Sequence, residues 1–380
     1  MHIAMAILAQ QPAKGLYLLG ALAFEATRFP IYLVRYLLRY GRQHPEWTLR
    51  QSLLTHVAAA VIRHLATIQH RTPLPLQAGA EGERFTTIKP AAATAYTGPL
   101  RGNADVAPVE IGATWYPAAL HAGSTTADVC VLLHIHGGAY VMGDGRTRDS
   151  GFMAQTLLRH TNATHLLFPQ YRLSTLPASA TSNPFPAGLQ DSLTAYLYLV
   201  NDLAIAPKHI ILSGDSAGGN MLIALLRYIS EYGADLGISS PSAALLWSPW
   251  IDPADTSGSY VHDNDHYATD YISPPFTAWG SAAYAGLAGL ETLKQAYISH
   301  KHRAFQTPTP LFVNTGGGEL LYYDNIEWAE MMDKAGNEVK LDVEPIVPHD
   351  ILALGNRLGF EKEANHCAKR VGEWLREVRK

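Results

Sequence analysis

The chain has 380 residues, 47% of them hydrophobic and 16% charged, a composition typical of a globular protein and not of a disordered one. Its 29 Lys and Arg against 33 Asp and Glu give a formal net charge of −4. Without a basic excess to hold a phosphate backbone, we expect no nucleic-acid partner. The two cysteines, Cys130 and Cys367, form no redox or zinc motif, which favours a reducing, cytoplasmic compartment.

Residues 1–100 are predicted to be an N-terminal helical cap segment followed by a linker. The run GLYLLGALAF (15–24) ends at Glu25 and is too short to span a bilayer. The next run, FPIYLVRYLLRYGR, interleaves Arg35, Arg39 and Arg42 with Tyr, Leu and Val, the pattern of a basic amphipathic helix. This helix would either cover an apolar pocket of the same protein or lie on a membrane surface. An exposed apolar face here would also make a homodimer reasonable.

Short apolar runs alternate with helical patterns from residue 101 to 380, the predicted catalytic domain. A Pro- and Gly-rich stretch at residues 71–108 is predicted to be a linker or loop. The alternation indicates an α/β fold with a mostly parallel central sheet and helices on both faces. The stretch at about 253–300 is longer than a single crossover connection needs, and we interpret it as a second cap insertion. The expected strands are DVCVLLHIH, THLLFPQYRLS, HIILSGD, SAALLWSPW, TPLFVNTGGGE and VKLDVEPIV.

Ser216 stands in GDSAG (214–218), a GxSxG pattern between an apolar strand and a helical run. Strand, tight turn and helix together favour an elbow that lifts the serine hydroxyl clear of the backbone. The alternatives at this point are a glycine-rich helix start and an anion-binding turn. The sequence therefore predicts Ser216 as a nucleophile.

Attack on a carbonyl builds negative charge on oxygen, which backbone N–H donors must stabilise. HIHGGAYVMGD follows an expected strand, and Gly137 and Gly138 would provide two donors beside Ala217, the residue after the nucleophile. His134 and His136 alternate on this strand, but no acidic residue follows at a metal-site spacing. We expect no metal ion and no cofactor.

A serine nucleophile needs a histidine base, and the base needs a carboxylate. Glu319 follows the strand FVNTG, and His349 follows the last strand, in the chain order Ser, acid, His. Asp324 is the rival acid, five residues later in a predicted helix. His300 and His302, in the basic stretch SHKHR, stand in the wrong order and are expected to be solvated.

These motifs together resemble those of the hormone-sensitive-lipase-like branch of the α/β-hydrolase superfamily, over about residues 125–380. HGGA stands where that family has HGGG, and GDSAGG, SPWID, YRLS and FPAGLQD match further family segments. After YRLS, the chain lacks the family's glutamate, which leaves open how that loop is anchored. The glutamate in GGGELL and the long helical N-terminus are similar to fungal members, some of which act in natural-product pathways.

The resemblance implies an α/β-hydrolase fold with a helical cap and a cofactor-free carboxylic ester hydrolase. Its substrate would be a small apolar ester: a short- or medium-chain acyl ester, a lactone or an acetyl ester. One alternative is a specialised biosynthetic enzyme that releases, transfers or rearranges a single pathway intermediate. A second alternative is a non-catalytic ligand-binding receptor on the same scaffold.

Overall fold

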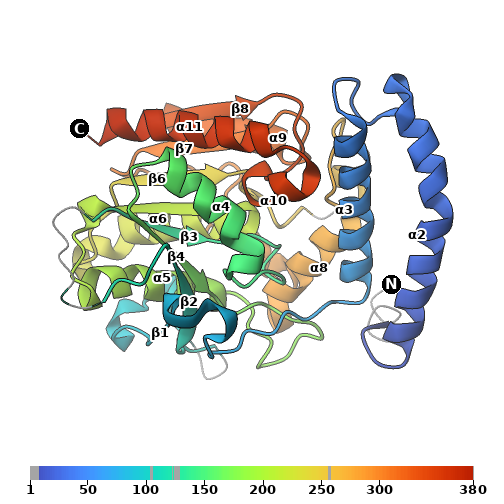
Figure 1. Ribbon diagram of the computed structural model, residues 1–380. Helices are drawn as coiled ribbons and strands as arrows, with labels where there is room; N and C mark the ends of the chain where they lie inside the picture. Colours follow the sequence, from blue (N-terminus) through green and yellow to red (C-terminus); the bar gives the residue numbers. More distant parts are fainter. Residues whose placement is uncertain (1–7, 103–105, 122, 124–128, 256–257, 380) are drawn as a thin grey trace.

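An eight-stranded sheet forms the centre of the computed structural model, which describes residues 8–102, 106–121, 123, 129–255 and 258–379 (Figure 1). The strand order is β1-β2-β4-β3-β5-β6-β7-β8; β2 runs antiparallel to both of its neighbours and the other pairs are parallel. The strands are β1 Phe85–Ile88, β2 Ile111–Tyr116, β3 Val131–Ile135, β4 His165–Gln170, β5 Ile210–Asp215, β6 Ala243–Trp247, β7 Leu311–Gly316 and β8 Val339–Glu344.

The six runs expected to be strands form β3 to β8, and the sequence analysis missed β1 and β2. β1 lies inside the stretch predicted to be a linker, so the sheet begins at Phe85, before residue 101. Its four residues, FTTI, are too few and too polar to give a strand pattern alone, and their pairing with β2 stabilises them. Residues 85–88 of the predicted linker therefore belong to the central sheet.

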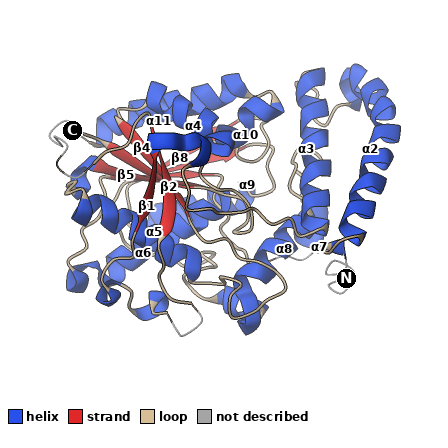
Figure 2. Ribbon diagram, turned by 60° about the horizontal axis from the view of Figure 1, so that its bottom comes forward, coloured by secondary structure: helices blue, strands red, loops and turns tan. Residues whose placement is uncertain are grey.

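Helices cover both faces of the sheet (Figures 1 and 2). α4 and α11 pack against each other on one face, and α5 and α6 on the other. α9 packs on β7 and β8. Strands β3 to β7 are fully buried, except for the first residue of β4, as expected for parallel strands covered on both sides. These helices are α4 Thr147–His160, α5 Ala187–Leu197, α6 Ser216–Leu236, α9 Tyr322–Lys334, α10 Ile351–Leu358 and α11 Glu361–Val378.

The N-terminal segment forms a helical hairpin of α2 Ala13–Leu37 and α3 Leu49–Thr67, which stands beside the α/β body (Figure 1). The two runs separated at Glu25 in the sequence are one continuous helix. Glu25 does not end it, because its carboxylate pairs with Arg63 and His64 of α3. α3 begins with a capping box in which Thr48 and Gln51 satisfy each other's backbone N–H groups.

α3 packs against the body through α8 and α10, whereas α2 packs mainly on α3. The insertion after β6 contributes α7 Gly258–His262 and α8 Pro274–Ala285. α8 and α3 thus lie together at one end of the body, and α2 forms the outer layer (Figures 1 and 2). α2 therefore does not cover a pocket of the body directly.

Candidate active site

Ser216 occupies a sharp turn between β5 and α6, with a backbone φ of +50° that L residues rarely adopt. A Cβ at Gly218 would lie 2.0 Å from the carbonyl oxygen of Ile135, and a Cβ at Gly214 would lie 2.7 Å from the carbonyl oxygen of Gly218. Only glycine fits at either position. The GxSxG pattern therefore has a steric cause, and the turn presents the serine at the carboxyl end of the sheet.

The side chains of Ser216, His349 and Glu319 lie in one hydrogen-bonded row. His349 Nε2 is 2.9 Å from Ser216 Oγ, and His349 Nδ1 is 3.2 Å from Glu319 Oε2. The three residues come from the turns after β5, β8 and β7, which end at the same edge of the sheet. In the productive tautomer, the serine hydroxyl donates to Nε2 and Nδ1–H donates to the carboxylate.

Glu319 is fully buried, and its second carboxylate oxygen accepts hydrogen bonds from Thr315 Oγ1 and from Asn325 Nδ2 at 2.9 Å. These donors fix the carboxylate facing His349. Burial alone lowers the pKa of His349, but the hydrogen bond and charge of Glu319, with the charges of Asp270 and Asp215, outweigh it and raise that pKa above 6.5.

Asp270, in the insertion after β6, joins the turns that carry the acid and the histidine. Its Oδ2 accepts from the backbone N–H of Leu320 at 2.7 Å, and its Oδ1 accepts from the N–H of Tyr271 at 2.6 Å and of His349 at 3.4 Å. Sequence reasoning missed this residue, because nothing in YATDYIS marks a carboxylate that bonds to backbone far along the chain. Burial raises the pKa of Asp270 to about 6.

The loop after β3 lies against the serine turn, and its backbone donors differ in what they bind. The N–H of Gly137 donates to Asp215 Oδ1 at 2.8 Å, so this donor is already engaged. Among the described residues, no hydrogen bond takes the N–H of Gly138 or of Ala139. Ala139 has a φ of +51°, in the left-handed region that L residues rarely adopt.

His134 of β3 holds the carboxylate of Asp215 in place. Its Nε2 lies 2.8 Å from Asp215 Oδ1, and its Nδ1 lies 2.9 Å from Ser213 Oγ. Burial opposes ionisation of Asp215, yet these contacts lower its pKa to about 2. Asp350, next to His349, is buried beside this charge, and both effects raise its pKa well above the usual range. Of the two carboxyl groups, Asp350 therefore holds its proton to higher pH than Asp215.

The remaining candidates of the sequence analysis lie elsewhere. Asp324 is in α9, where it binds Lys301 at 2.9 Å and Tyr260 at 3.0 Å. His302 is exposed, as expected. His300 is fully buried with Nε2 3.0 Å from the carbonyl oxygen of Asn220, and burial lowers its pKa to about 3, so the prediction of a solvated His300 is wrong. In the part of the chain that the structure describes, no group of three His, Cys, Asp or Glu side chains could hold a metal ion.

A cavity of about 200 Å³ opens at Ser216 and His349. Ile62 of α3 lines it, so the N-terminal hairpin contributes one wall. Arg357 and Asp149, 3.0 Å apart and partly exposed, lie at its edge. Its other apolar lining residues are Met142, Met153, Phe276, Ala353 and Leu354.

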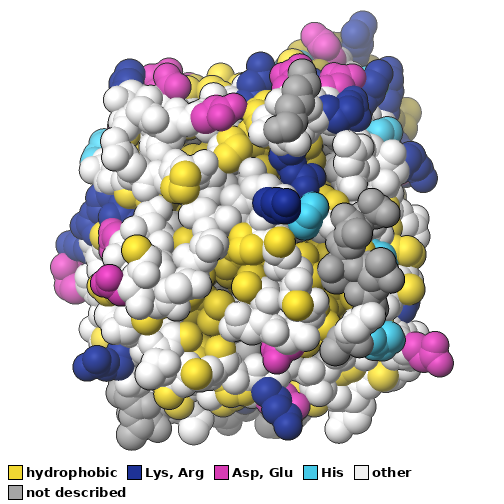
Figure 3. Space-filling view, turned by 90° about the vertical axis from the view of Figure 1, so that its left-hand side faces the viewer, with side chains coloured by type: hydrophobic (Ala, Val, Ile, Leu, Met, Phe, Trp, Pro, Cys, Tyr) yellow, Lys and Arg dark blue, Asp and Glu magenta, His cyan; other side chains and the backbone are white. Residues whose placement is uncertain are grey.

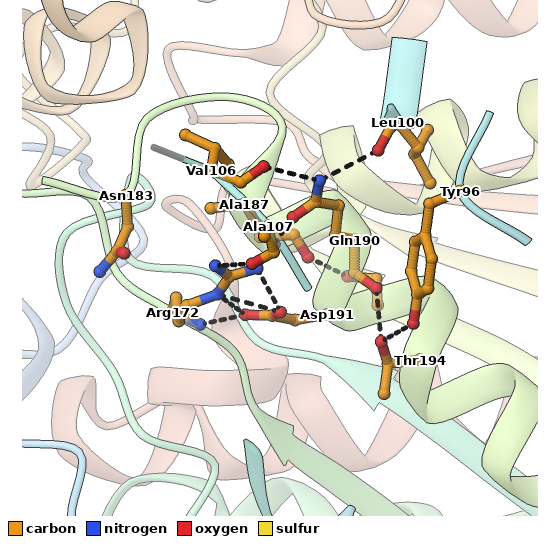
Figure 4. Close-up of polar contacts among 12 residues, drawn as sticks. Tyr96, Leu100, Val106, Ala107, Arg172, Asn183, Ala187, Gln190, Asp191 and Thr194 are labelled. Atoms are coloured by element: carbon orange, nitrogen blue, oxygen red, sulfur yellow. Dashed lines mark hydrogen bonds and ion pairs between the residues drawn. The ribbon is translucent and has the colours of Figure 1, made fainter. Parts of the chain in front are cut away.

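The loop after β4 is anchored by Arg172 of the YRLS segment (Figure 4). The Arg172 guanidinium binds Asp191 of α5 at 2.8 Å, and the backbone N–H of Arg172 donates to the same carboxylate at 2.8 Å. Its other N–H groups donate to Ala107, Ala187 and Gln190. Asp191, in the FPAGLQD segment, thus anchors the loop that lacks the family's glutamate.

Comparison with known proteins places these features in a family context. Residues 132–353 match a family model described as alpha/beta hydrolase fold. The chain is 25% identical over 261 residues to an acetyl-hydrolase of Streptomyces hygroscopicus, covering 65% of this chain and 77% of that protein. It is 26% identical over 256 residues to the carboxylesterase NlhH of Mycobacterium tuberculosis, covering 62% and 74%.

Solved structures show the same similarity. The esterase EstE5, in a crystal soaked with p-nitrophenyl butyrate, aligns with a TM-score of 0.58 and 25% identity over 86% of this chain and 98% of its own. An esterase from the bacterial hormone-sensitive lipase family aligns with a TM-score of 0.59 and 24% identity, over 86% and 98%.

Proposed function

Because the chain belongs to the α/β-hydrolase fold family, in its hormone-sensitive-lipase-like branch, we propose that it cleaves carboxylic esters through Ser216, His349 and Glu319. The chain is similar to esterases and acetyl-hydrolases, and this similarity identifies it as an esterase. The observation that carries the triad is the 2.9 Å separation of Ser216 Oγ and His349 Nε2, with Glu319 behind the imidazole.

The reaction has two acyl-transfer steps. His349 Nε2 removes the proton of Ser216 as Oγ attacks the ester carbonyl, and the tetrahedral intermediate collapses when the alcohol oxygen takes that proton. Water, deprotonated by the same nitrogen, then attacks the acyl-enzyme and releases the acid. Glu319 accepts the hydrogen bond of Nδ1–H and so holds the imidazolium in place.

The oxyanion donors in this proposal are the backbone N–H groups of Gly138, Ala139 and Ala217. Gly137 was expected to be one of them, but its N–H donates to Asp215. Ala139 takes its place: a methyl side chain leaves the backbone N–H available, and this N–H has no partner within the described chain. Gly137 instead ties the loop to the base of the serine turn.

The size of the cavity favours short acyl groups. Its volume of about 200 Å³ is below the roughly 300–1,000 Å³ of most ligand sites. Met142, Met153 and Phe276 provide apolar walls. An acetyl or butyryl group fits such a space, whereas the chain of a long fatty acid is too large for it.

A series of p-nitrophenyl esters of increasing acyl length tests the proposal. Turnover should be highest for acetate to butyrate, should fall with longer chains, and should be lost in Ser216→Ala. Ser230→Ala, an exposed serine further along α6, is the matched control and should keep full activity. Ser216 should also react with a fluorophosphonate probe.

The other outcomes separate the alternatives. Labelling of Ser216 without turnover of any generic ester would point to the specialised biosynthetic reaction. Absence of both turnover and labelling in a folded protein would contradict the proposed hydrolysis and favour a ligand-binding receptor.

A further inference from the structure

The surface of α2 is apolar on nearly every exposed side. Its exposed residues carry aliphatic, aromatic, proline or glycine side chains, apart from Thr27 and Arg35. Leu19 and Val34, on the side away from α3, are 67% and 64% exposed. Helical periodicity places Leu16, Ala23 and Leu37 on the same outer side, so a stripe without charge runs along the whole helix.

The apolar surface continues into the groove between α2 and α3. Leu18, Leu22 and Phe29 of α2 face Val57 and Val61 of α3 across a groove of about 310 Å³. Val57 and Val61 are exposed, while the polar Ser52 and Thr55 of α3 are buried. Val57 and Val61 are thus turned away from the body, although Ile62 of the same helix lines the catalytic cavity, so α3 has apolar residues on its outer side as well.

The face of the molecule opposite the hairpin also has apolar side chains near its middle, but other side chains and backbone separate them, and Lys, Arg, Asp and Glu lie mainly around its edge (Figure 3). Large contiguous apolar patches on soluble proteins mark contact surfaces. We therefore expect another molecule or a membrane to contact the apolar surface of α2.

Polar contacts hold α2 packed lengthwise against α3. Glu25 binds Arg63 at 2.8 Å and His64 at 3.1 Å, and Tyr17 binds His64 at 2.8 Å. The ring of Tyr32 packs on that of His56 with centroids 3.7 Å apart. Among the described residues, α2 is the one helix long and apolar enough to cross a membrane, yet these contacts keep it parallel to a helix packed on the body.

The charge around α2 is opposite to that of the whole chain. Residues 13–42 carry Lys14, Arg28, Arg35, Arg39 and Arg42 against Glu25, a net charge of +4, while the chain carries −4. Since Glu25 pairs with α3, its charge does not offset the arginines of the α2 end. A second copy would bring these arginines against each other, whereas an anionic lipid surface would attract them.

We propose that the outer side of α2 docks on an anionic membrane surface, lying in the interface with its apolar stripe among the acyl chains. Arg35 and Arg39, which are both exposed, would meet the lipid headgroups. At about 1.5 Å per residue, the 25 residues of α2 would lie along roughly 37 Å of the surface.

Docking would place the two helices of the hairpin, α2 and α3, between the lipid and the candidate active site. Ile62, which lines the catalytic cavity, belongs to α3, and α2 packs on the other side of that helix. This arrangement favours, as substrates, short acyl esters of lipophilic alcohols that dissolve in the membrane, an inference that rests on the proposed function.

Flotation of the purified full chain with lipid vesicles tests the docking without measuring activity. We expect binding to vesicles of phosphatidylcholine mixed with phosphatidylserine, and weaker binding to phosphatidylcholine alone. The double variant Leu19→Gln/Val34→Gln should bind at least about tenfold more weakly, because two side chains no longer enter the apolar layer. Leu287→Gln, an equally exposed leucine (71%) outside the hairpin, is the matched control and should bind like the unmodified chain.

The charge is tested separately. Arg35→Gln/Arg39→Gln should bind the anionic vesicles about tenfold or more weakly and should leave binding to phosphatidylcholine unchanged, since each arginine near the surface contributes about 1 kcal/mol. A far-UV circular dichroism spectrum and a thermal melt like those of the unmodified chain would show that each variant is folded.

Two results would overturn the proposal. One is a monomer that binds neither vesicle type. The other is a dimer that Leu19→Gln/Val34→Gln dissociates, again without vesicle binding, which would make a second copy the occupant. Because flotation does not depend on turnover, failure of docking and failure of the esterase proposal would be distinguishable.

Discussion

The carboxylate of Asp270 accepts a hydrogen bond from the backbone N–H of Leu320, the residue that follows Glu319, at 2.7 Å. The same carboxylate reaches the N–H of His349 at 3.4 Å. One side chain from the insertion after β6 thus bonds to the turns that carry His349 and Glu319. Asp270 holds these turns in place, so the insertion is structurally coupled to the candidate site.

Replacement of Asp270 by Asn should lower kcat by about 10- to 100-fold with little change in KM, because a small misplacement of the base is costly and the cavity is untouched. The asparagine NH₂ group cannot accept from Leu320. Steady-state kinetics with a p-nitrophenyl ester measures the effect. Exposed Asp202→Asn is the control. Equal rates for Asp270→Asn and the unmodified enzyme would remove Asp270 from the positioning of the triad.

The stability of the same variant should depend on pH. Burial raises the pKa of Asp270 to about 6 in the folded protein, from an ordinary value of 3.8. The native state therefore binds the proton more tightly than the unfolded chain, and the ionised form is disfavoured by up to about 3 kcal/mol. Thermal melts should show the unmodified protein gaining stability relative to Asp270→Asn as pH falls from 8 to 5. A constant difference across this range would contradict a raised pKa.

The pH dependence of turnover should follow His349. Its pKa is raised above 6.5, and the general base must be neutral, so kcat/KM should fall as pH drops through a value above 6.5. Glu319→Gln removes the charge and hydrogen bond that raise this pKa. The acid limb should move to lower pH, and kcat should fall by about 10³- to 10⁴-fold.

The matched control is Glu327→Gln, an exposed carboxylate on α9 that pairs with His302. It should leave both the limb and kcat unchanged. An acid limb that stays in place in Glu319→Gln would show that another group sets the ionisation of His349.

How far the sequence predicts this molecule depends on whether a feature is local. The strands β3 to β8 are continuous apolar runs, and Ser216, Glu319 and His349 each follow one of them in a fixed order, so their neighbourhood could be inferred. β1 exists only because β2 pairs with it. The bonds of Asp270 and the burial of His300 against Asn220 join residues 50 or more positions apart, which no local pattern records.

The continuity of α2 was missed for the same reason. Glu25 looked like the end of an apolar run, but Arg63 and His64 of another helix neutralise it. For Gly137, the motif predicted a backbone N–H that is free to bind the oxyanion. In the fold, this N–H donates to Asp215 instead.

Gly218→Ala should abolish activity by displacing the serine turn. The added methyl would lie 2.0 Å from the carbonyl oxygen of Ile135, and backbone at the centre of the sheet cannot shift to relieve the clash. We expect a loss of more than about 3 kcal/mol in the free energy of unfolding, measured by urea denaturation. Gly20→Ala, on exposed α2 with open space around its Cβ, should instead be neutral or stabilising by up to about 1 kcal/mol. Similar effects for both variants would refute the steric argument.

Asp191→Ala should destabilise the protein by about 3–5 kcal/mol, because it leaves the Arg172 guanidinium, only 14% exposed, without its carboxylate. The loop from β4 would lose the anchor that four hydrogen bonds to Asp191 provide. Urea denaturation measures the change. Glu291→Ala, which breaks the exposed pair with Lys294, should cost less than about 1 kcal/mol.

The double variant Arg172→Met/Asp191→Leu separates the buried charge from the anchor. If the unpaired guanidinium causes most of the loss, this double variant should be more stable than Asp191→Ala, since it buries no lone charge. If instead it is equally unstable, the hydrogen bonds that Arg172 makes to Ala107, Ala187 and Gln190 hold the loop, and the ion pair itself contributes little. Either result identifies the interaction that replaces the family's glutamate.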